Sequence, residues 1–386
     1  MKIVGIICEY NPFHKGHKKQ FDIIRSIHGP DTVIVCLMSG NYVQRGAPAV
    51  YNKMIRAEAA LLSGADLVLE LPVTASISSA EGFAAKGVAI LSPICDYLCF
   101  GTESNDLDSY MQASTALLTD EYSVLLKEAL TTGISFPAAR QTVLKQLNCN
   151  DSVITNPNDI LAVEYCKAII QQNSKMQPMP IHREGNYHAP EADFSNPSAT
   201  SLRTLICDGC NISAYTTDSA ASLFSNATVH SLKAGERAML AKLRSMTESD
   251  FSALPYGSEG LWRKFMHAVA ESATIEDIIS KTKSKRYTRT RIDRMIMCAY
   301  LGITKDMLEA TVPYVRILGF NYTGRKILRS AKERCLLVNI GEVQKDPYQC
   351  LESLCTDLYG LFAESNEESS GAERQYRIIY IPDPKK

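Results

Sequence analysis

The chain has 386 residues, with 41 basic and 42 acidic side chains and a formal net charge of −1. This length predicts two or more domains, because a single hydrophobic core seldom grows beyond about 250–300 residues. The balanced charge excludes a protein that binds polyanions over its whole surface, so a nucleic-acid site would be a local patch.

Nothing in the chain predicts export or membrane insertion. The run Ile3–Cys8 is too short for the apolar region of a signal peptide, and no stretch approaches the length that spans a bilayer. The 12 cysteines follow no regular framework. We therefore expect a cytoplasmic protein with reduced thiols and no structural disulfides.

The N-terminal part alternates short apolar runs with helical patterns, which indicates βαβ units and a parallel sheet. The predicted strands are Lys2–Cys8, Thr32–Met38, Asp66–Leu71 and Asp96–Phe100. The predicted helices between them are Lys15–Ile27, Tyr51–Ser63 and Ser79–Leu91. A sheet of this kind collects ligands beyond the carboxyl ends of its strands.

The pattern becomes mostly helical from Leu107 to about Gln172, and Pro157 favours the start of one of these helices. Met179–His182 follows as a fifth strand. Gly185–Pro197 is predicted to be a loop because it is rich in Asn, Pro and Asp, and Ser198–Ile206 a short helix.

Helical patterns dominate after Ile212, so we predict a domain boundary near Gly209. Residues 1–209 form an α/β domain with a Rossmann-like parallel sheet and helices on both faces, and residues 210–386 form a mainly helical domain. Near the end, Tyr376–Ile381 is predicted to be an isolated strand.

The stretch Glu9–His17 carries the most specific chemical pattern. It places His14, Gly16 and His17 where the first strand gives way to a helix, whose N-terminus presents free N–H groups to an anion. Both imidazoles can donate to phosphate oxygens and stabilise charge on phosphorus during displacement. The alternative is two surface histidines in a loop.

His14-Lys15-Gly16-His17 resembles the HxGH signature of the nucleotidylyltransferase superfamily. Ser198–Arg203 resembles the superfamily's second element, a Ser/Thr-rich turn that ends in Arg, except that Ala199 replaces the usual second serine. Thr200 and Arg203 remain available for phosphate contacts.

The chain also resembles the bacterial tRNA(Met) cytidine acetate ligase family along nearly its whole length. The blocks that carry the resemblance are Gly5–His14, Met38–Gly46, Gly64–Pro72, Phe100–Glu103, Asn158–Leu161 and Arg183–Gly185. Residues 1–209 are accordingly expected to be the ATP-binding catalytic domain, and residues 210–386 the domain that binds tRNA.

The resemblance implies His14, His17 and Arg203 as catalytic residues. The ATP-binding residues that it implies are Ile7, Cys8, Glu9, Tyr10, Asn11, Pro12, Phe13, His14, Lys15, Gly16, His17, Lys18, Lys19, Gln20, Gly101, Asn158, Arg183 and Thr200. Gly101 follows a strand and would let the adenine pack against bare backbone. Asn158, next to Pro157, is explained almost as well as a simple capping residue. Mg²⁺ is expected only as a companion of ATP phosphates.

Other residues near the same edge are less specific. Asn41, Gln44 and Arg45 follow the second strand and belong either to the site or to a solvated loop. Lys53 and Arg56 on the next helix are expected to decorate the surface. Cys207 and Cys210 have a metal-clip spacing, but a structural zinc site needs four ligands, so we favour ordinary thiols and predict no metal site.

A basic segment, Lys281–Arg294, contains a single acidic residue, Asp293. Such a cluster is a candidate contact for an RNA backbone, and Tyr287 within it could stack on a base. The residues predicted to bind tRNA are Lys285, Arg286, Arg289 and Arg291. The same basic bias continues at Arg316, Arg325, Lys326, Arg329 and Lys332. The alternative is a solvated helix face.

The expected reaction follows from the resemblance. Acetate and ATP would form acetyl-adenylate and diphosphate, and the acetyl group would pass to the wobble cytidine of elongator tRNA(Met), giving N(4)-acetylcytidine and AMP. Two alternatives remain. One is an adenylyltransferase that joins AMP to a small phosphorylated metabolite, and the other is a non-catalytic, nucleotide-dependent RNA-binding factor.

Overall fold

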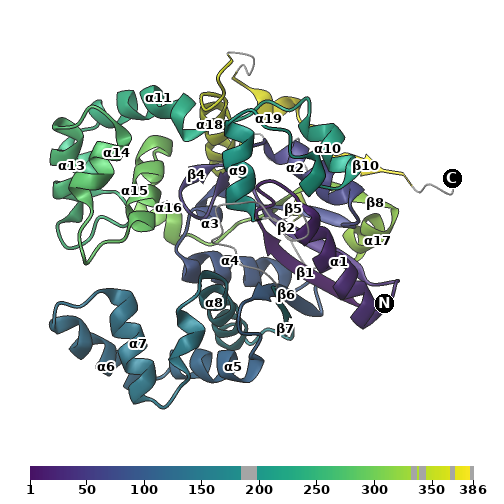
Figure 1. Ribbon diagram of the computed structural model, residues 1–386, viewed down its shortest axis with the longest axis horizontal. Coiled ribbons are helices and arrows are strands. Elements are labelled where there is room, and N and C mark those ends of the chain that lie inside the picture. Colours follow the sequence, from purple (N-terminus) through teal and green to yellow (C-terminus); the bar gives the residue numbers. More distant parts are fainter. Residues whose placement is uncertain (184–197, 332–336, 339–344, 366–369, 383–386) are drawn as a thin grey trace.

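The computed structural model describes residues 1–183, 198–331, 337–338, 345–365 and 370–382 (Figure 1). The predicted loop Gly185–Pro197 and Lys332 of the basic C-terminal residues lie outside these ranges.

One mostly parallel sheet organises the molecule, with the strand order β10-β8-β5-β2-β1-β6-β7 and β9 paired to β8. Its strands are β1 Ile3–Cys8, β2 Val33–Ser39, β5 Leu67–Leu71, β6 Tyr97–Thr102, β7 Gln177–His182, β8 Val315–Asn321, β9 Leu337–Val338 and β10 Ile379–Ile381. Only the pairing of β5 with β8 is antiparallel among the described strands of this sheet. The five strands predicted in the first half of the chain are confirmed.

Helices cover both faces of the sheet, which explains why every residue of β2 is buried. Alternate residues of β2 enter two separate cores, with Val33, Val35 and Leu37 in one and Ile34 and Cys36 in the other. Most helical residues of the first core come from α4 Ala80–Leu91, α5 Leu107–Ala116, α8 Pro157–Gln171 and α17 Tyr322–Ala331. Those of the second core come from α1 Lys15–His28, α2 Lys53–Leu62, α9 Ala199–Cys207 and α10 Asp218–Phe224.

A third core holds the helical part of the molecule, which Figure 1 shows on the side away from the N-terminus. Its helices are α11 Leu232–Arg244, α12 Glu248–Ser252, α13 Leu261–Ala270, α14 Ile275–Thr282, α15 Arg289–Leu301 and α18 Pro347–Gly360. The other elements are α3 Val73–Ser76, α6 Asp120–Thr131, α7 Phe136–Gln146, α16 Lys305–Glu309, α19 Ala372–Gln375, the 3₁₀ turns Asp151–Ile154 and Ser213–Tyr215, and the hairpin strands β3 Tyr42–Val43 and β4 Ala47–Pro48.

The prediction of an isolated strand at Tyr376–Ile381 is wrong, because β10 pairs in parallel with β8. Strand β8 itself was hidden in a region that the sequence pattern assigned to helices, and it packs against β5. The sheet therefore draws strands from both sides of the boundary predicted near Gly209, and that boundary does not separate sheet from helices.

None of the described helices is long and apolar enough to cross a membrane. The cysteines in the described ranges are all free thiols.

Candidate active site at the carboxyl edge of the sheet

His14 and His17 form a stacked pair where β1 passes into α1. His14 is the N-cap of α1, and its Nδ1 accepts a hydrogen bond from the Gly16 amide at 3.1 Å. The His14 amide in turn donates to Nδ1 of His17 at 3.2 Å. The ring centroids are 3.7 Å apart, with an interplanar angle of 27°. This reciprocal capping box fixes both rings relative to the helix N-terminus.

The environment keeps both imidazoles neutral. Burial, together with the charges of Arg183 and Arg203, lowers the pKa of His14 from 6.5 to about 3. Burial and the neighbouring His14 hold the pKa of His17 well below its usual value. Since Nδ1 of each ring accepts a backbone N–H, the ring proton resides on Nε2. Nε2 of His14 is buried and lacks a partner among the described residues, so it is a donor without an acceptor.

Arg203 and Thr200 come from the first turns of α9. They lie beside the loop that joins β1 to α1 and carries His14. Arg203 Nη1 donates to the Asn11 carbonyl at 2.9 Å, and Nη2 donates to Thr200 Oγ1 at 3.0 Å. Ser198 caps α9 by accepting a hydrogen bond from the Ser201 amide at 3.0 Å. The structure thus brings Thr200 and Arg203 to the loop that carries His14, as the sequence predicts.

Arg183 occupies the space above Gly101 at the end of β6. A Cβ atom on Gly101 would stand 2.7 Å from Cδ of Arg183. The Arg183 side chain fills the space beside Gly101, and a contact between Gly101 and adenine stays a prediction. Gly101 allows Arg183 to lie near both histidines.

Asn158 does not cap its helix, since Asn156 holds the N-cap position of α8. Its Nδ2 donates to Oε1 of Glu103 at 2.7 Å, and its Oδ1 accepts from Arg183 Nη1 at 3.5 Å. Glu103 also accepts the Asp159 amide at 3.0 Å. Glu103 was not singled out from the sequence, yet it orients Asn158 and through it Arg183.

The other residues predicted to bind ATP divide into two groups. The first group packs against the histidines. Tyr10 and Phe13 are buried, and their ring centroids lie 4.8 and 5.5 Å from that of His17. Asn11 accepts the Val50 amide at 2.8 Å. Its further members are Ile7, which packs on Gly87, the half-buried Cys8 and Glu9, and the buried Pro12.

The second group is engaged along α1. Lys15 Nζ donates to the Ala214 carbonyl at 2.7 Å, and Lys18 pairs with Asp22. Gln20 donates to Cys99 Sγ at 3.4 Å, and Lys19 is exposed.

Arg56 was expected on the surface, and this prediction is wrong: its side chain is fully buried. Its guanidinium donates to the carbonyls of Glu9 at 2.5 Å and Ser39 at 3.1 Å, and also to Gly40. Nε reaches the Tyr51 carbonyl at 2.8 Å. Arg56 therefore joins the loops that leave β1 and β2. A fixed fork of donors suits such carbonyls, which would otherwise be buried without partners.

Lys53 is likewise buried, contrary to expectation. Its Nζ lies 2.7 Å from carboxylate oxygens of both Glu70 and Glu373. Arg316 contacts the same two carboxylates, so two cations and two anions form one buried cluster. Burial of these charges is tolerated because each one is paired.

The hairpin β3–β4 links this edge to the helical part. Asn41 is buried and structural, since its Oδ1 accepts the Lys53 amide at 2.9 Å. The backbone N–H of Gln44 donates to Oε1 of Glu9 at 2.9 Å. Arg45 is exposed. At Gly46 a Cβ atom would stand 2.6 Å from the backbone nitrogen of Arg294, so the hairpin packs directly on α15.

Carboxylates from other elements neutralise part of the positive charge of the basic segment. Arg286 pairs with Glu259 at 2.6 Å and Arg289 with Glu276 at 2.6 Å, both between exposed side chains. Arg291 is half-buried and donates to the Tyr256 carbonyl at 2.9 and 2.8 Å. Lys285 is exposed. Exposed pairs are worth little and can be exchanged for phosphates, whereas Arg291 has a structural role.

No group of three or more His, Cys, Asp or Glu within the described ranges is placed to hold a metal ion. Cys207 and Cys210 are exposed free thiols. The site is therefore built from imidazoles, guanidinium groups and helix N-termini, which suits a polyphosphate.

Comparisons with known proteins agree with this geometry. The family model described as HIGH Nucleotidyl Transferase matches residues 1–375. The tRNA(Met) cytidine acetate ligase of Acetivibrio thermocellus is 36% identical, over 93% of this chain and 94% of the relative. The enzyme of the same name from Caldicellulosiruptor saccharolyticus is 36% identical, over 99% of both chains.

Two solved structures of Thermotoga maritima TmcAL are also similar. The apo form superposes with a TM-score of 0.90 at 28% identity, covering 99% of this chain and 100% of that chain. The form bound with alpha-thio ATP superposes with a TM-score of 0.89 at 29% identity and the same coverage. The chain therefore belongs to the HIGH nucleotidyl transferase family and, within it, to the tRNA(Met) cytidine acetate ligases.

Proposed function

We propose that the protein is an ATP-dependent ligase that forms acetyl-adenylate from acetate and ATP and transfers the acetyl group to the wobble cytidine of elongator tRNA(Met). The observation that carries this proposal is the pair of neutral, stacked histidines at the N-terminus of α1, which lie close to Arg183 and Arg203. The names of the related enzymes supply the acetate, the tRNA and the cytidine.

In the first step an acetate oxygen attacks the α-phosphorus of ATP, and the bond to the β-phosphate bridging oxygen breaks to release diphosphate. His14 and His17 donate from Nε2 to phosphate oxygens on which charge builds, and Arg183 and Arg203 balance that charge. The N-terminus of α1 adds its backbone N–H groups. Because the rings are already neutral donors, no proton has to be moved before this step.

In the second step the exocyclic N4 amine of the cytidine attacks the acetyl carbonyl carbon. The carbon–oxygen bond to the phosphate breaks, AMP leaves, and the nitrogen loses one proton. The enzyme contributes positioning and electrostatics, and no covalent enzyme intermediate is needed. The exposed cations Lys285, Arg286 and Arg289 are proposed to hold the tRNA backbone.

Mg²⁺ is proposed to arrive with the ATP phosphates and to neutralise part of their charge, since the described residues provide no cluster of ligands for it. We propose a cytoplasmic location, because the reaction uses ATP and tRNA. We propose that residues 1–209 carry out the ATP chemistry and that residues 210–386 make the tRNA contacts. Strands from both parts nevertheless share the sheet.

The test uses purified protein, ATP and radiolabelled acetate, first without RNA and then with a tRNA(Met) transcript. Label is expected in acetyl-adenylate in the first case and in the tRNA in the second. A transcript with uridine in place of the wobble cytidine is the matched control and should remain unlabelled. AMP joined to a phosphorylated metabolite would favour the adenylyltransferase instead, and RNA binding without ATP turnover would favour the non-catalytic factor.

A further inference from the structure

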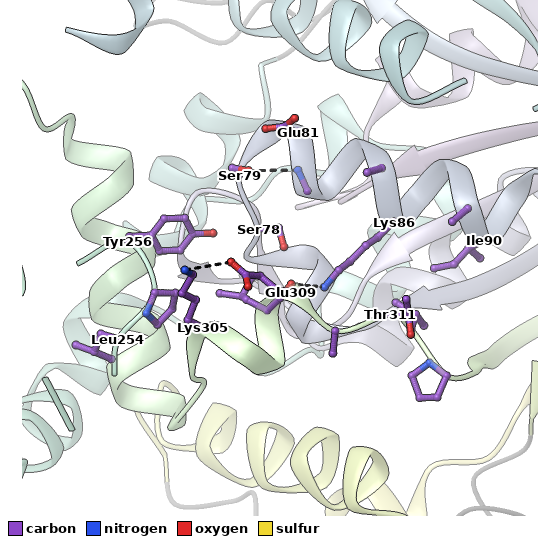
Figure 2. A pocket seen from close by; sticks show the side chains of 18 of the residues that line it. Ser78, Ser79, Glu81, Lys86, Ile90, Leu254, Tyr256, Lys305, Glu309 and Thr311 are labelled. Carbon is purple, nitrogen blue, oxygen red and sulfur yellow. Dashed lines mark hydrogen bonds and ion pairs between the residues drawn. The ribbon is translucent and has the colours of Figure 1, made fainter. Parts of the chain in front are cut away.

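A large cavity lies beside α4, on the side that faces the helical part of the molecule. Its volume is about 1200 Å³. One wall comes from α4 and the residues before it, and the other comes from the turn after α12, the start of α13, and α16. Figure 2 shows Ser78 and Lys86 on one side, facing Tyr256, Lys305 and Glu309 on the other. We call this space the α4 cavity.

One end of the α4 cavity adjoins the candidate active site. Gln44 donates its amide to Glu9, in the loop that precedes His14, and its Nε2 donates to the carbonyl of Ser78 at 3.4 Å. Ser78 lines the cavity. Gln44 therefore links Ser78, on the cavity wall, to Glu9 in the loop that precedes His14.

The opposite wall adjoins the basic segment. Tyr256, Ser258 and Glu259 line the cavity. Arg291 holds the Tyr256 carbonyl and also Ser258 Oγ at 2.9 Å, and Arg286 pairs with Glu259. The cavity wall is thus joined through Gln44 to the loop that precedes His14, and through Arg291 and Arg286 to the basic segment.

The turn on this wall is held in a strained conformation. Tyr256 and Glu259 have φ angles of 67° and 60°, in the left-handed region that few residues other than glycine adopt. Arg291 fixes the Tyr256 backbone, and the guanidinium of Arg294 lies 5.0 Å from the centroid of its ring. Strain of this kind persists where the surroundings enforce it, and it is typical of ligand clamps.

The charges beside the cavity suit the phosphate groups that flank each base of an RNA strand. The lining carboxylates are each paired: Glu81 with Lys167 at 2.7 Å, Glu259 with Arg286 at 2.6 Å and Glu309 with Lys305 at 3.6 Å. Lys86 donates to the backbone carbonyls of Leu308 at 2.6 Å and Thr74 at 3.2 Å, and no carboxylate contact is made by it within the described ranges. Lys86 lines the cavity, and Arg291 and Arg294, which are not lining residues, contact Tyr256, so basic side chains lie beside a largely apolar and aromatic space.

We propose that the α4 cavity holds an unstacked base of the RNA substrate, a neighbour in the strand of the cytidine that reacts. The inference rests on the proposed function. Trp262 and Tyr256 provide aromatic faces for stacking, and the hydroxyl groups of Ser78 and Ser79 provide polar contacts for base edges. Seating a neighbouring base would splay the loop and present the cytidine to acetyl-adenylate.

Trp262 makes the cavity directly observable, because it is the single tryptophan in the chain. The probe is a stem–loop RNA with the sequence of the anticodon arm of tRNA(Met), together with versions in which one loop position at a time is abasic. We expect the intact RNA to quench Trp262 emission. One abasic position other than the reacting cytidine should remove the quenching and raise the Kd at least about fivefold.

A matched pair of variants tests the same point through affinity. Ala85 lies on the cavity wall, and Ala253 is an exposed neighbour of the lining residues. We expect Ala85→Phe to weaken binding of the stem–loop at least about fivefold and Ala253→Phe to leave it unchanged. Both should form acetyl-adenylate at the wild-type rate without RNA, which also reports correct folding.

The possible failures are distinguishable. RNA that binds, as measured by fluorescence anisotropy of a labelled stem–loop, while Trp262 emission stays constant at every abasic position would overturn the subsite alone. RNA that does not bind at all would contradict the proposed function as well.

Discussion

Nζ of Lys53 lies 2.7 Å from Oε1 of Glu373, a residue 320 positions later in the chain. Glu373 also contacts Arg316, and its side chain is completely buried. Through this carboxylate the C-terminal α19 is tied to α2 and to strand β8. The C-terminal residues are thus part of the same folded unit as the candidate active site.

Replacing this carboxylate should destabilise the whole protein. Glu373→Gln removes one of the two anions that compensate Lys53 and Arg316, and breaking a buried pair in this way costs about 3–5 kcal/mol. Urea unfolding followed by circular dichroism measures the change. Lys305→Ala, which removes an exposed pair with Glu309, is the control and should stay within about 0.5 kcal/mol. A loss below about 1 kcal/mol for Glu373→Gln would contradict the buried cluster.

Removing a single histidine donor should slow adenylate formation without unfolding the protein. His14→Asn keeps an acceptor near the position of Nδ1, which caps α1, but has no group that reaches the position of Nε2. We expect the rate of acetate-dependent diphosphate release to fall on the order of a hundredfold. His17→Ala should lower this rate by a similar factor. Near-normal rates in either variant would remove that residue from the chemistry.

Acidification should destabilise the protein through His14. The pKa of His14 is 6.5 in the unfolded chain and about 3 in the folded protein. Between these pH values the unfolded chain therefore binds a proton at His14 that the folded protein does not bind. The contribution of His14 is complete above pH 6.5 and is lost as the pH falls towards 3. Between pH 7 and pH 5 the loss from His14 is about 2 kcal/mol. His14→Asn should show a correspondingly smaller decrease in the free energy of unfolding, and equal slopes for both proteins would contradict the buried neutral ring.

The basic segment should matter for tRNA and not for ATP. Replacing Lys285, Arg286 and Arg289 together with Ala should weaken tRNA binding and reduce the slope of log K against log salt by roughly two to three. Acetyl-adenylate formation without tRNA should be unchanged. Arg291 is left out because it holds the Tyr256 turn.

A triple Ala variant of Lys127, Lys145 and Lys175, exposed lysines outside the segment, serves as the control for the salt measurement. Unchanged tRNA affinity with impaired ATP chemistry in the basic-segment variant would show that the division between the two halves of the chain is wrong.

The sequence predicted the elements whose pattern is local. The alternation of apolar strands and amphipathic helices sufficed for β1, β2, β5, β6 and β7, and the His14–His17 spacing sufficed for the loop at their edge. These features depend on neighbouring residues, which the periodicity of the chain records directly.

What the sequence could not predict depends on contacts between distant residues. Arg56 follows ordinary helical spacing, and nothing nearby shows that the carbonyls of Glu9 and Ser39 will surround it. Strand β8 contains Arg316, which breaks the apolar run, and its partner Glu373 lies far along the chain. The sequence pattern could not predict that these charged residues are buried, because each charge is paired with a group from another element.

Mass spectrometry of the nucleosides from a tRNA(Met) transcript shows directly whether the protein acetylates the wobble cytidine. The transcript is incubated with the purified protein, ATP and isotope-labelled acetate, and is then digested. We expect labelled N(4)-acetylcytidine at the wobble position, formed together with AMP, and none with the His14→Asn variant. Unmodified cytidine in the presence of active, ATP-consuming protein would contradict the proposed function.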